Sequence, residues 1–441
     1  MSDLSERRLI KRYALPVIIL FSVLFRVAAA IYMGNEVVEL PGTFDQISYH
    51  QLALRVVSGQ GFTFGQDWWP LTGANQPTAH WSYLYTLFLV LVYKVIGPHP
   101  LAVRLIQSVL VGVIQPYLAF LLGNMVMNRK VGLIYAGLTA GYAYFIYYAA
   151  ALMTEPFFIT VVMASLYLTI RIGNVRKGSD EQEQKRQVGG YWDYVVLGIM
   201  LGVAILLRQV FLLVVPILFL FIYWSKRKVS IWGIMLATFI IVLMILPFSI
   251  YNNDRFDRFV LLNTNAGFAF FWANHPIYGA RFQPILSPEL GSYQDLIPHE
   301  LRHLDEAALD QALLQRGIQF VFEDPFRYVL LSVSRIPAYF KFWPSSDSST
   351  VSNISRVGSF GILLPWIIFG TIVVVFGRKE DQIESTSGVK ILLIFCIVYS
   401  GIHILTWALI RYRLPVDAIL LVFAAIGLLN FVHFLRRTFP K

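Results

Sequence analysis

A small set of charged side chains in an otherwise apolar sequence is the first feature that suggests chemistry. Arginine guanidinium groups pair bidentately with phosphate oxygens, and lipid phosphate is the anion that a membrane arginine cluster is best placed to meet. A free carboxylate beside such a cluster suits a general base that activates an acceptor hydroxyl or amine. These residue types together favour displacement at a sugar carbon with lipid phosphate as the leaving group. The set comprises Asp45, Glu155, Arg208, Arg411, Arg413 and His80.

Each of these residues also has a purely structural interpretation. Asp45 suits the dipole of a helix start, and its local pattern supports that interpretation about as well as a functional one. Glu155 precedes Pro156 at a helix amino end, where a carboxylate is worth about 0.3–1 kcal/mol. Arg208 separates two apolar runs and can extend its head to the membrane surface. An arginine on the outer side nevertheless opposes the positive-inside bias, and this favours a functional role.

The composition indicates the elements that must position this set. Of 441 residues, 57% are hydrophobic, 15% aromatic and only 14% charged, which excludes an ordinary soluble domain and predicts an all-α polytopic membrane protein. The net charge of +10 suits anionic lipid and positive cytoplasmic loops, and no basic block indicates a nucleic-acid partner. The single cysteine, Cys396, excludes an intramolecular disulfide.

Positive charges decide which apolar runs cross the membrane. Ten spans place the clusters that begin at Arg7, Arg129, Arg171, Lys226, Arg378 and Arg436 in the cytoplasm, together with both termini. The helix after Trp81 is then half-embedded, because a full span there would move Arg129 outside. We expect a bacterial or archaeal plasma membrane. The spans are 14–33, 102–126, 131–150, 157–172, 193–207, 209–224, 230–250, 357–376, 390–409 and 415–435.

Two long outer loops, 34–101 and 251–356, hold the remaining candidates. In the first, Thr43 and Gln46 have capping-box spacing, which predicts an amphipathic helix that Gly59 ends. In the second, Pro298 precedes a predicted amphipathic helix. The loop also contains a predicted interfacial helix over 326–343 and a polar tether over Ser345–Ser355. The chain therefore divides into a membrane module 1–250, an outer loop 251–356 and C-terminal helices 357–441.

Several reaction classes have no support in the sequence. It contains no zinc motif, phosphate-binding glycine loop, Ser-His-Asp spacing or dinucleotide fingerprint. We therefore expect no cofactor and no nucleotide-driven step, while a divalent metal stays open.

A series of short motifs resembles the GT-C membrane glycosyltransferases, in particular the polyprenyl-phosphate-sugar-dependent branch. That branch includes the protein O-mannosyltransferases and the lipid A aminoarabinose transferases. The resemblance covers nearly the whole chain, although the lipid A transferases have a lysine where this chain has Gln76. The motifs are Asp45 with Tyr49 and Leu52-Ala53, Gly59-Gln-Gly61-Phe62, Gln76-Pro77-Thr-Ala-His80-Trp-Ser-Tyr83, Ile96-Gly97, Val103-Arg104-Leu105, Asn128-Arg-Lys-Val-Gly132, Thr154-Glu155, Leu207-Arg208, Trp272-Ala-Asn274-His275-Pro276 and Arg411-Tyr-Arg413-Leu-Pro415.

The resemblance implies a GT-C-like bundle and an inverting transfer on the extracytoplasmic side. A hexosyl or pentosyl group would move from a polyprenyl-phosphate-linked donor to a lipid, glycan or protein acceptor among membrane lipids. Asp45 falls on the catalytic base and Glu155 on the second acidic residue of the active site. Arg208, Arg411 and Arg413 fall on donor-phosphate contacts. The substrate-binding positions are Tyr49, His80, Tyr83, Asn274 and His275.

Two other classes share some of these features. A transporter or lipid flippase would also place arginines and carboxylates in a helical bundle, but related halves with interrupted helices are expected there. An O-antigen-ligase-like enzyme would share the outer arginines, but the Asp45 loop has no clear role in it. The enzyme that uses a lipid-phosphate-linked sugar is therefore preferred.

Overall fold

The computed structural model describes residues 2–173, 190–225, 230–346, 348–377 and 386–438. Within these residues the chain is helical and has no β-strand beyond three isolated bridges. The bundle helices are α1 (Ser2–Met33), α4 (Pro100–Val126), α5 (Arg129–Gly141), α6 (Ala143–Ala150), α7 (Glu155–Gly173), α9 (Tyr191–Leu207), α10 (Val215–Ser225), α11 (Ser230–Phe256), α16 (Ile362–Phe376), α17 (Thr386–Leu405) and α18 (Ile410–Thr438). The other α-helices are α2 (Asp45–Val57), α3 (Tyr83–Ile96), α12 (Ala266–Asn274), α13 (Glu306–Glu323), α14 (Pro325–Tyr339) and α15 (Thr350–Arg356).

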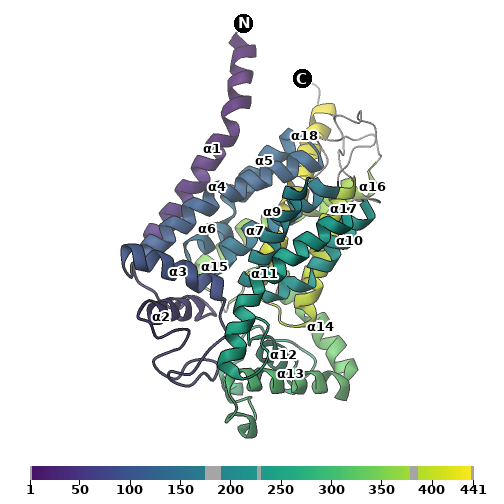
Figure 1. The fold of residues 1–441 in the computed structure, drawn as a ribbon. Helices are drawn as coiled ribbons and strands as arrows, with labels where there is room; N and C mark the ends of the chain where they lie inside the picture. The colour runs from purple at the N-terminus through teal and green to yellow at the C-terminus, as the bar shows by residue number, and fades with distance from the viewer. Residues whose placement is uncertain (1, 174–189, 226–229, 347, 378–385, 439–441) are drawn as a thin grey trace.

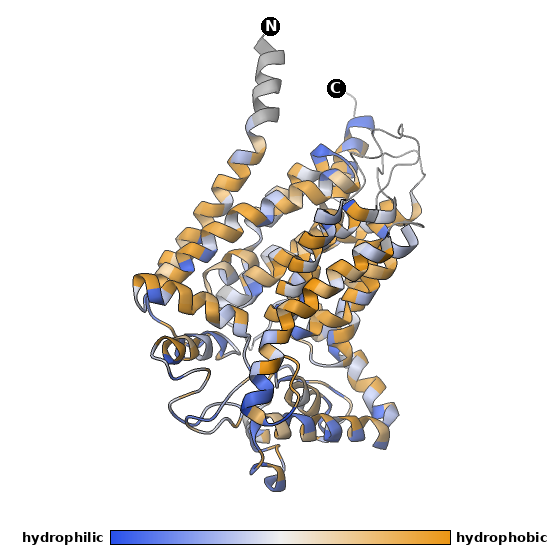
Figure 2. Cartoon of the chain, viewed as in Figure 1, coloured by the Kyte–Doolittle hydropathy of each residue, from blue (hydrophilic) through white to orange (hydrophobic). Residues whose placement is uncertain are grey.

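The helices form an elongated bundle with most of the loop structure at one end. Helix α1 begins and helix α18 ends at the same end of the bundle, as Figure 1 shows. Helices α2, α12 and α13 lie at the opposite end, which is called the loop end below. Orange, apolar residues dominate the bundle helices and blue, polar residues gather toward the loop end (Figure 2). This arrangement agrees with an integral membrane protein whose two long loops share one side.

Among the described residues, seven helices are long and apolar enough to cross a bilayer. They are α1, α4, α7, α11, α17, α18 and the helical stretch Ser352–Phe376 that contains α16. The predicted count of ten is not confirmed. Helix α9 and the stretch Gln209–Ser225 are shorter apolar helices, and the predicted span 131–150 is broken into α5 and α6.

The break between α5 and α6 has a clear physical basis. Tyr142 adopts an extended conformation, so neither helix reaches the roughly 20 residues that a full span needs. The carbonyls of Thr139 and Ala140 lose their partners in α5, and both accept hydrogen bonds of 3.2 Å from the buried Arg26 side chain. At the end of α6, the Ala150 carbonyl accepts a hydrogen bond of 3.0 Å from Arg104. Two buried arginines therefore satisfy the backbone that the break exposes.

Glycines allow the closest helix contacts in the bundle. A Cβ atom on Gly123 of α4 would lie 2.8 Å from the Cα atom of Gly132 in α5. One on Gly370 of α16 would lie 1.8 Å from the backbone oxygen of Phe423 in α18. Small residues at crossings of this kind let helix backbones approach each other in membranes. Helices α4 with α5, and α16 with α18, are therefore locked together.

The loops differ from the sequence predictions in three places. The capping box of Thr43 and Gln46 is wrong, because Phe44 is the N-cap of α2 and the Gln46 amide donates to the Val38 carbonyl instead. The amphipathic helix expected after Pro298 begins only at Glu306, with Asp305 as its N-cap. The predicted tether 345–355 contains helix α15. Helices are present near Trp81 and within the range 326–343, as α3 and α14, while their predicted placement at the membrane surface stays a prediction.

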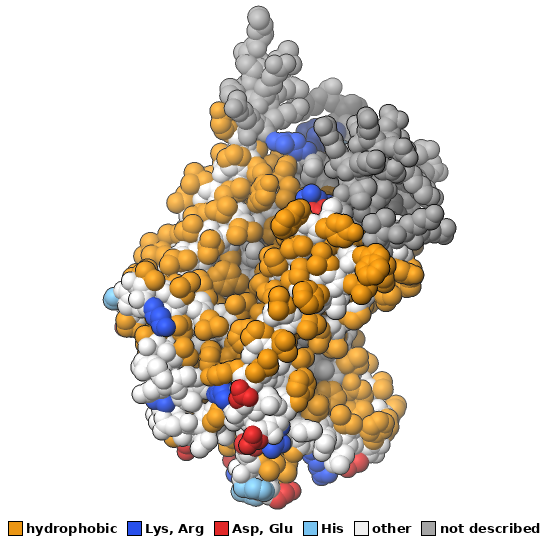
Figure 3. Space-filling model, in the orientation of Figure 1, with side chains coloured by type: hydrophobic (Ala, Val, Ile, Leu, Met, Phe, Trp, Pro, Cys, Tyr) orange, Lys and Arg blue, Asp and Glu red, His pale blue; other side chains and the backbone are white. Residues whose placement is uncertain are grey.

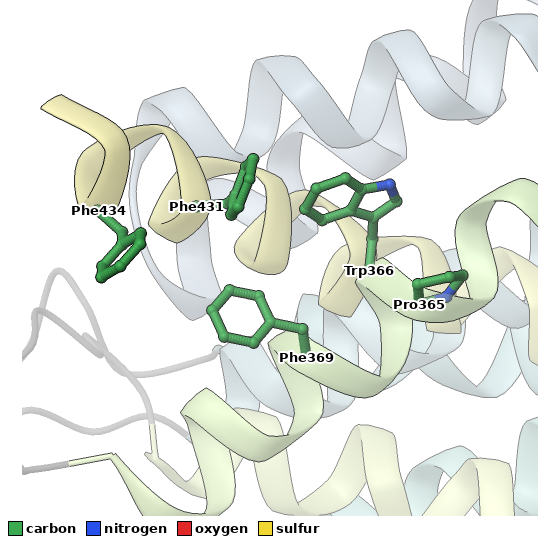
Figure 4. A pocket seen from close by; sticks show the side chains of 5 residues that line it. All are labelled: Pro365, Trp366, Phe369, Phe431 and Phe434. Carbon is green, nitrogen blue, oxygen red and sulfur yellow. The ribbon is translucent and has the colours of Figure 1, made fainter. Parts of the chain in front are cut away.

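An apolar groove of about 440 Å³ lies between α16 and α18. The aromatic rings of Trp366 and Phe431 face each other across it at a centroid distance of 5.1 Å, as Figure 4 shows. Its lining contains no charged side chain, so it is chemically distinct from the polar site described next. The lining residues are Pro365, Trp366, Phe369, Phe431 and Phe434.

Candidate active site

Asp45 is the first residue of α2, and its carboxylate forms an ion pair with Arg411. The hydroxyl of Thr43 supports both partners: it accepts hydrogen bonds of 3.1 Å from the Asp45 backbone amide and from the Arg411 guanidinium. The side chains of Arg411 and Asp45 remain 15% and 22% exposed. This ion pair joins the first loop to the start of the last helix, a contact that the sequence analysis did not predict.

Glu155 is the first residue of α7, where its charge also favours the helix dipole. Its carboxylate pairs with Arg208 at 2.5 Å, and the Arg208 Nε atom lies 3.3 Å from the Thr154 hydroxyl. Arg208 separates α9 from the short 3-10 helix η1 (Gln209–Leu213), so a kink between two apolar helices presents this guanidinium. The Arg208 and Glu155 side chains are 13% and 3% exposed, and this pair is the deeper of the two.

Tyr412 brings the two ion pairs together. The Arg208 guanidinium lies 5.3 Å from the centre of its ring, and the Arg411 guanidinium lies 5.1 Å from it. The Tyr412 hydroxyl also accepts a hydrogen bond of 3.3 Å from Arg411. The ring of His403 stacks on Tyr412 at 4.9 Å. Asp45, Glu155, Arg208, Arg411 and Tyr412 therefore form one group, called the paired-charge cluster below.

The sequence analysis quoted Tyr412 only as part of the Arg411-Tyr-Arg413 motif and assigned it no role. Its position between the two arginines in the sequence was a weak signal, because aromatic rings commonly accept guanidinium groups. The long-range packing that brings Arg208 to the same ring has no local signature.

Arg413 lies apart from the paired-charge cluster. Its side chain is fully buried and forms an ion pair of 2.8 Å with Asp417, one turn later in α18. It also donates to the Tyr339 carbonyl, and Tyr142 donates to Asp417 at 2.7 Å. The predicted spans 390–409 and 415–435 place Arg411 and Arg413 in a short connection, which is wrong, since α18 already begins at Ile410. Two residues along a helix turn the side chain by about 200°, so Arg411 and Arg413 face different partners.

Three predicted substrate-binding residues line the first loop and are buried. The Tyr49 hydroxyl accepts a hydrogen bond of 3.3 Å from the Ser82 amide, and the Tyr83 hydroxyl donates one of 2.5 Å to Asn252. The His80 ring lies 3.2 Å from the Thr264 carbonyl. Burial lowers the pKa of His80, while the nearby carboxylates of Glu306 and Asp45 oppose that shift. His80 thus has its own partners in the second loop and forms no hydrogen bond with Asp45.

The other two predicted substrate-binding residues, Asn274 and His275, have structural contacts in the second loop. The Asn274 side chain accepts a hydrogen bond of 2.8 Å from Arg335, and its backbone carbonyl accepts one of 3.0 Å from Arg327. Burial, together with the charges of Arg327 and Arg316, lowers the pKa of His275 to about 4. The structure does not bring these two residues into the paired-charge cluster.

Glu306 is a buried carboxylate that the sequence analysis did not single out. It accepts hydrogen bonds from the hydroxyls of Thr72 at 2.6 Å and Thr264 at 2.5 Å, and from the Ala79 amide at 2.8 Å. One side chain of α13 thus ties the first outer loop to the second. In sequence, Glu306 resembles any acidic residue at a helix start.

Among the described residues, no group of three His, Cys, Asp or Glu side chains is arranged to hold a metal ion.

Residues 80–251 match the sequence profile of a family described as dolichyl-phosphate-mannose-protein mannosyltransferase. The matching stretch contains Glu155 and Arg208 and leaves out Asp45 and Arg411. The chain has no match among curated protein sequences.

Solved structures give longer matches. The archaeal oligosaccharyltransferase AglB from Archaeoglobus fulgidus, in complex with an inhibitory peptide and a dolichol-phosphate, matches with a TM-score of 0.58 and 17% identity over 98% of this chain and 52% of that chain. Its apo form gives a TM-score of 0.60 and 16% identity over 97% and 51%. ArnT from Cupriavidus metallidurans bound to undecaprenyl phosphate gives a TM-score of 0.42 and 13% identity, over 97% of this chain and 79% of that chain.

The chain spans about half the length of the oligosaccharyltransferase structures that it matches. At this level of identity, the likeness to AglB is one of fold. The resemblance to the GT-C membrane glycosyltransferases is therefore confirmed for the architecture, and the paired-charge cluster lies within that architecture.

Proposed function

We propose that this protein is an inverting glycosyltransferase that uses a polyprenyl-phosphate-linked sugar as its donor. The sugar, a hexosyl or pentosyl group, passes to a lipid, glycan or protein acceptor at the extracytoplasmic face of the membrane. The observation that carries this proposal is the paired-charge cluster, in which two carboxylates and two arginines from four distant parts of the chain meet at Tyr412.

Arg208 and Arg411 bind the donor phosphate in this proposal. Both guanidinium groups are partly exposed, and both face the same aromatic ring. A phosphate between them would exchange carboxylate partners for phosphate oxygens, which guanidinium groups bind in the same bidentate way. Arg413 is left out of this role because its guanidinium is buried against Asp417.

Asp45 acts as the general base. Displacement of Arg411 toward the phosphate leaves the Asp45 carboxylate to take the proton of the acceptor hydroxyl or amine. The acceptor atom forms a bond to the anomeric carbon while the bond from that carbon to the phosphate oxygen breaks. The bonding electrons leave with the polyprenyl phosphate, whose charge Arg208 and Arg411 stabilise. One displacement of this kind inverts the anomeric centre.

Glu155 orients Arg208 and balances its charge. Its side chain is 3% exposed, so it is less accessible to an acceptor than Asp45. We therefore assign Glu155 to the phosphate-binding side of the cluster and Asp45 to the acceptor side.

The family profile and the shared fold support an enzyme over a flippase. The profile also makes a polyprenyl-phosphate-linked mannose the first donor to test. Membranes that contain the protein should convert this donor to free polyprenyl phosphate and add the mass of one sugar residue to an acceptor. Mass spectrometry of both products checks this. Movement of intact donor across the bilayer, without release of polyprenyl phosphate, would contradict the proposal in favour of transport.

A further inference from the structure

A polar cavity of about 690 Å³ opens at the loop end of the molecule. Its walls come from the first outer loop near Gln76, from the end of α11 near Arg258 and from the start of α13 near Asp305. Cavities of about 300–1,000 Å³ are typical of small-molecule sites. Charged residues of both signs are visible near the end of α11 in Figure 3. The sequence analysis did not predict this cavity.

The charges that line the cavity cancel. Three arginines face three carboxylates, so the lining favours neither an anionic nor a cationic ligand. The same set supplies many hydrogen-bond donors and acceptors, and Leu71, Pro77, Phe256 and Leu304 add apolar surface. The charged residues are Arg255, Arg258, Arg302, Asp257, Asp305 and Glu306.

Part of this lining is a fixed wall. Both oxygens of Glu306 are engaged by the two outer loops, and Arg302 donates to the carbonyls of Ile297 and Gln294 at 3.0 Å. Arg255 donates to the Phe62 carbonyl at 2.6 Å. These contacts hold the backbone around the cavity in place.

Other side chains of the lining are exposed. Arg258 and Asp305 form an ion pair of 3.3 Å whose side chains are 38% and 47% exposed. Exposed ion pairs of this kind contribute little to stability, so their hydrogen-bonding groups can turn to a ligand. Gln76 and His303 are exposed as well. The cavity thus combines a fixed wall with adaptable polar groups.

The cavity is connected to the paired-charge cluster through His80. Glu306, in the cavity wall, accepts a hydrogen bond from the amide of Ala79, the residue before His80. The His80 ring packs against Trp81 at a centroid distance of 5.1 Å, and Trp81 packs against Tyr49 at 5.6 Å. Tyr49 belongs to α2, which begins at Asp45, so a chain of side-chain contacts joins the cavity wall to the helix of the proposed base.

We propose that this cavity binds the acceptor, and that the acceptor is a neutral carbohydrate chain. A saccharide presents hydroxyl groups that donate and accept hydrogen bonds, carries no net charge and has apolar ring faces, which matches the lining. A peptide is commonly bound by extension of a sheet edge, and the described residues contain no strand to extend. This inference rests on the proposed glycosyltransferase function.

The test uses the full chain in lipid nanodiscs and three neutral trisaccharides: mannotriose, maltotriose and N-acetylchitotriose. Saturation-transfer NMR measures their binding without donor. The cavity variant carries Gln76→Ala, Arg258→Ala and His303→Ala. Arg316→Ala is the matched control. It also removes an exposed arginine, but Arg316 pairs with Glu323 at 3.9 Å in α13 and does not line the cavity. Gln76→Ala alone repeats the test if the triple variant unfolds early.

We expect at least one trisaccharide to bind, with its affinity lowered about tenfold or more in the cavity variant and unchanged in Arg316→Ala. Hydrolysis of the donor, in which water takes the place of the acceptor, should stay at the wild-type rate in the cavity variant, because the paired-charge cluster is intact. Failure of all three trisaccharides to bind, or equal binding by the cavity variant, overturns the inference. A serine-containing octapeptide is tested as well. If it binds the wild-type protein but not the cavity variant, and the trisaccharides bind neither, the cavity is a peptide site. Absence of donor hydrolysis in the wild-type protein would count against the glycosyltransferase function itself.

Discussion

Arginines serve two different purposes in two regions of this molecule. At the break between α5 and α6, Arg26 and Arg104 donate to backbone carbonyls that the interrupted helices leave without partners. At the loop end, Arg208 and Arg411 pair with the carboxylates of Glu155 and Asp45. The first kind of contact replaces helix hydrogen bonds, and the second balances charge.

The difference lies in what each arginine would lose by moving. Release of Arg26 leaves buried carbonyls unpaired, which costs about 1–3 kcal/mol for each group. Release of Arg411 toward a phosphate exchanges one anion for another at a partly exposed position. An arginine suited to binding has a partner that a ligand can replace and has access to solvent, whereas a structural arginine has neither. Charge and membrane depth alone do not make that distinction.

The largest effect is expected for Asp45→Asn, which tests the acceptor side of the cluster. The amide keeps the size of the side chain and an oxygen that can accept from Arg411, but it removes basicity. Turnover at saturating donor should fall by about 10²–10⁴-fold while the protein stays folded. Transfer rates measured from the mass of the product check this. Glu155→Gln is the control, and its turnover should fall less than that of Asp45→Asn. Near-normal turnover in folded Asp45→Asn would reduce Asp45 to a helix-start residue.

The donor side of the cluster is tested by Arg208→Ala. Loss of a charge-assisted contact to phosphate should raise the KM for the donor about 10–100-fold. Arg208→Lys should recover part of this loss, because lysine keeps the charge without the bidentate geometry. Arg413→Ala is the comparison variant and should lower thermal stability without a comparable change in donor KM. Unchanged donor affinity in Arg208→Ala would move Arg208 into the structural class.

The structural class is tested by Arg26→Met, which keeps an unbranched apolar side chain in place of the guanidinium. The carbonyls of Thr139 and Ala140 then lose their donors, and stability should fall by about 1–3 kcal/mol for each unpaired group. The midpoint of thermal unfolding in nanodiscs measures the loss. The KM for the donor should stay within about twofold, since Arg26 bonds Ser22, Gln115 and the α5 carbonyls and makes no direct contact with the paired-charge cluster. A large change in donor KM with normal stability would break the distinction between the two classes.

The smallest effect concerns His275 and the pH dependence of stability. Its pKa is about 4 in the folded protein and about 6.5 in an unfolded chain. Between these values the unfolded state binds a proton that the folded state does not, so stability falls as the pH drops from about 6.5 to 4. His275→Gln should weaken this acid sensitivity and leave donor KM unchanged. Unfolding midpoints at pH 7 and pH 4.5 provide the measurement, and a raised acceptor KM would instead support the substrate role predicted from sequence.

The sequence predicts the general form of this fold well, because apolar runs and positive clusters report directly on the bilayer. It also predicts that Asp45, Glu155, Arg208 and Arg411 share one side of the bundle. The break at Tyr142 has no comparable signal, since an interrupted apolar run and a continuous one have the same composition. Distant side chains, among them Arg26, Arg104 and Gln107, donate to the backbone carbonyls that the interruption leaves without helical partners.

The remaining differences arise from contacts between residues far apart in the chain. Arg411 and Arg413 have the same type and nearly the same position, yet helical rotation sends them to Asp45 and to Asp417. Glu306 stands in a helical pattern that fits any exposed acidic residue, and only the folded loops bury it. The capping-box spacing of Thr43 and Gln46 was correct as a pattern but was overridden by tertiary contacts.

The separation of Asp45 and Arg411 also has a consequence for biosynthesis. These partners lie 366 positions apart, the first at the start of α2 and the second in the first turn of α18. At about 5–20 residues per second, a ribosome needs roughly 20–70 s to make the chain between them. During that interval Asp45 and α2 have already been made, while the arginine that pairs with the Asp45 carboxylate has not. The paired-charge cluster is therefore incomplete until α18 has been made, and a chain that stops before α18 lacks Arg411 and Tyr412, two of its five residues.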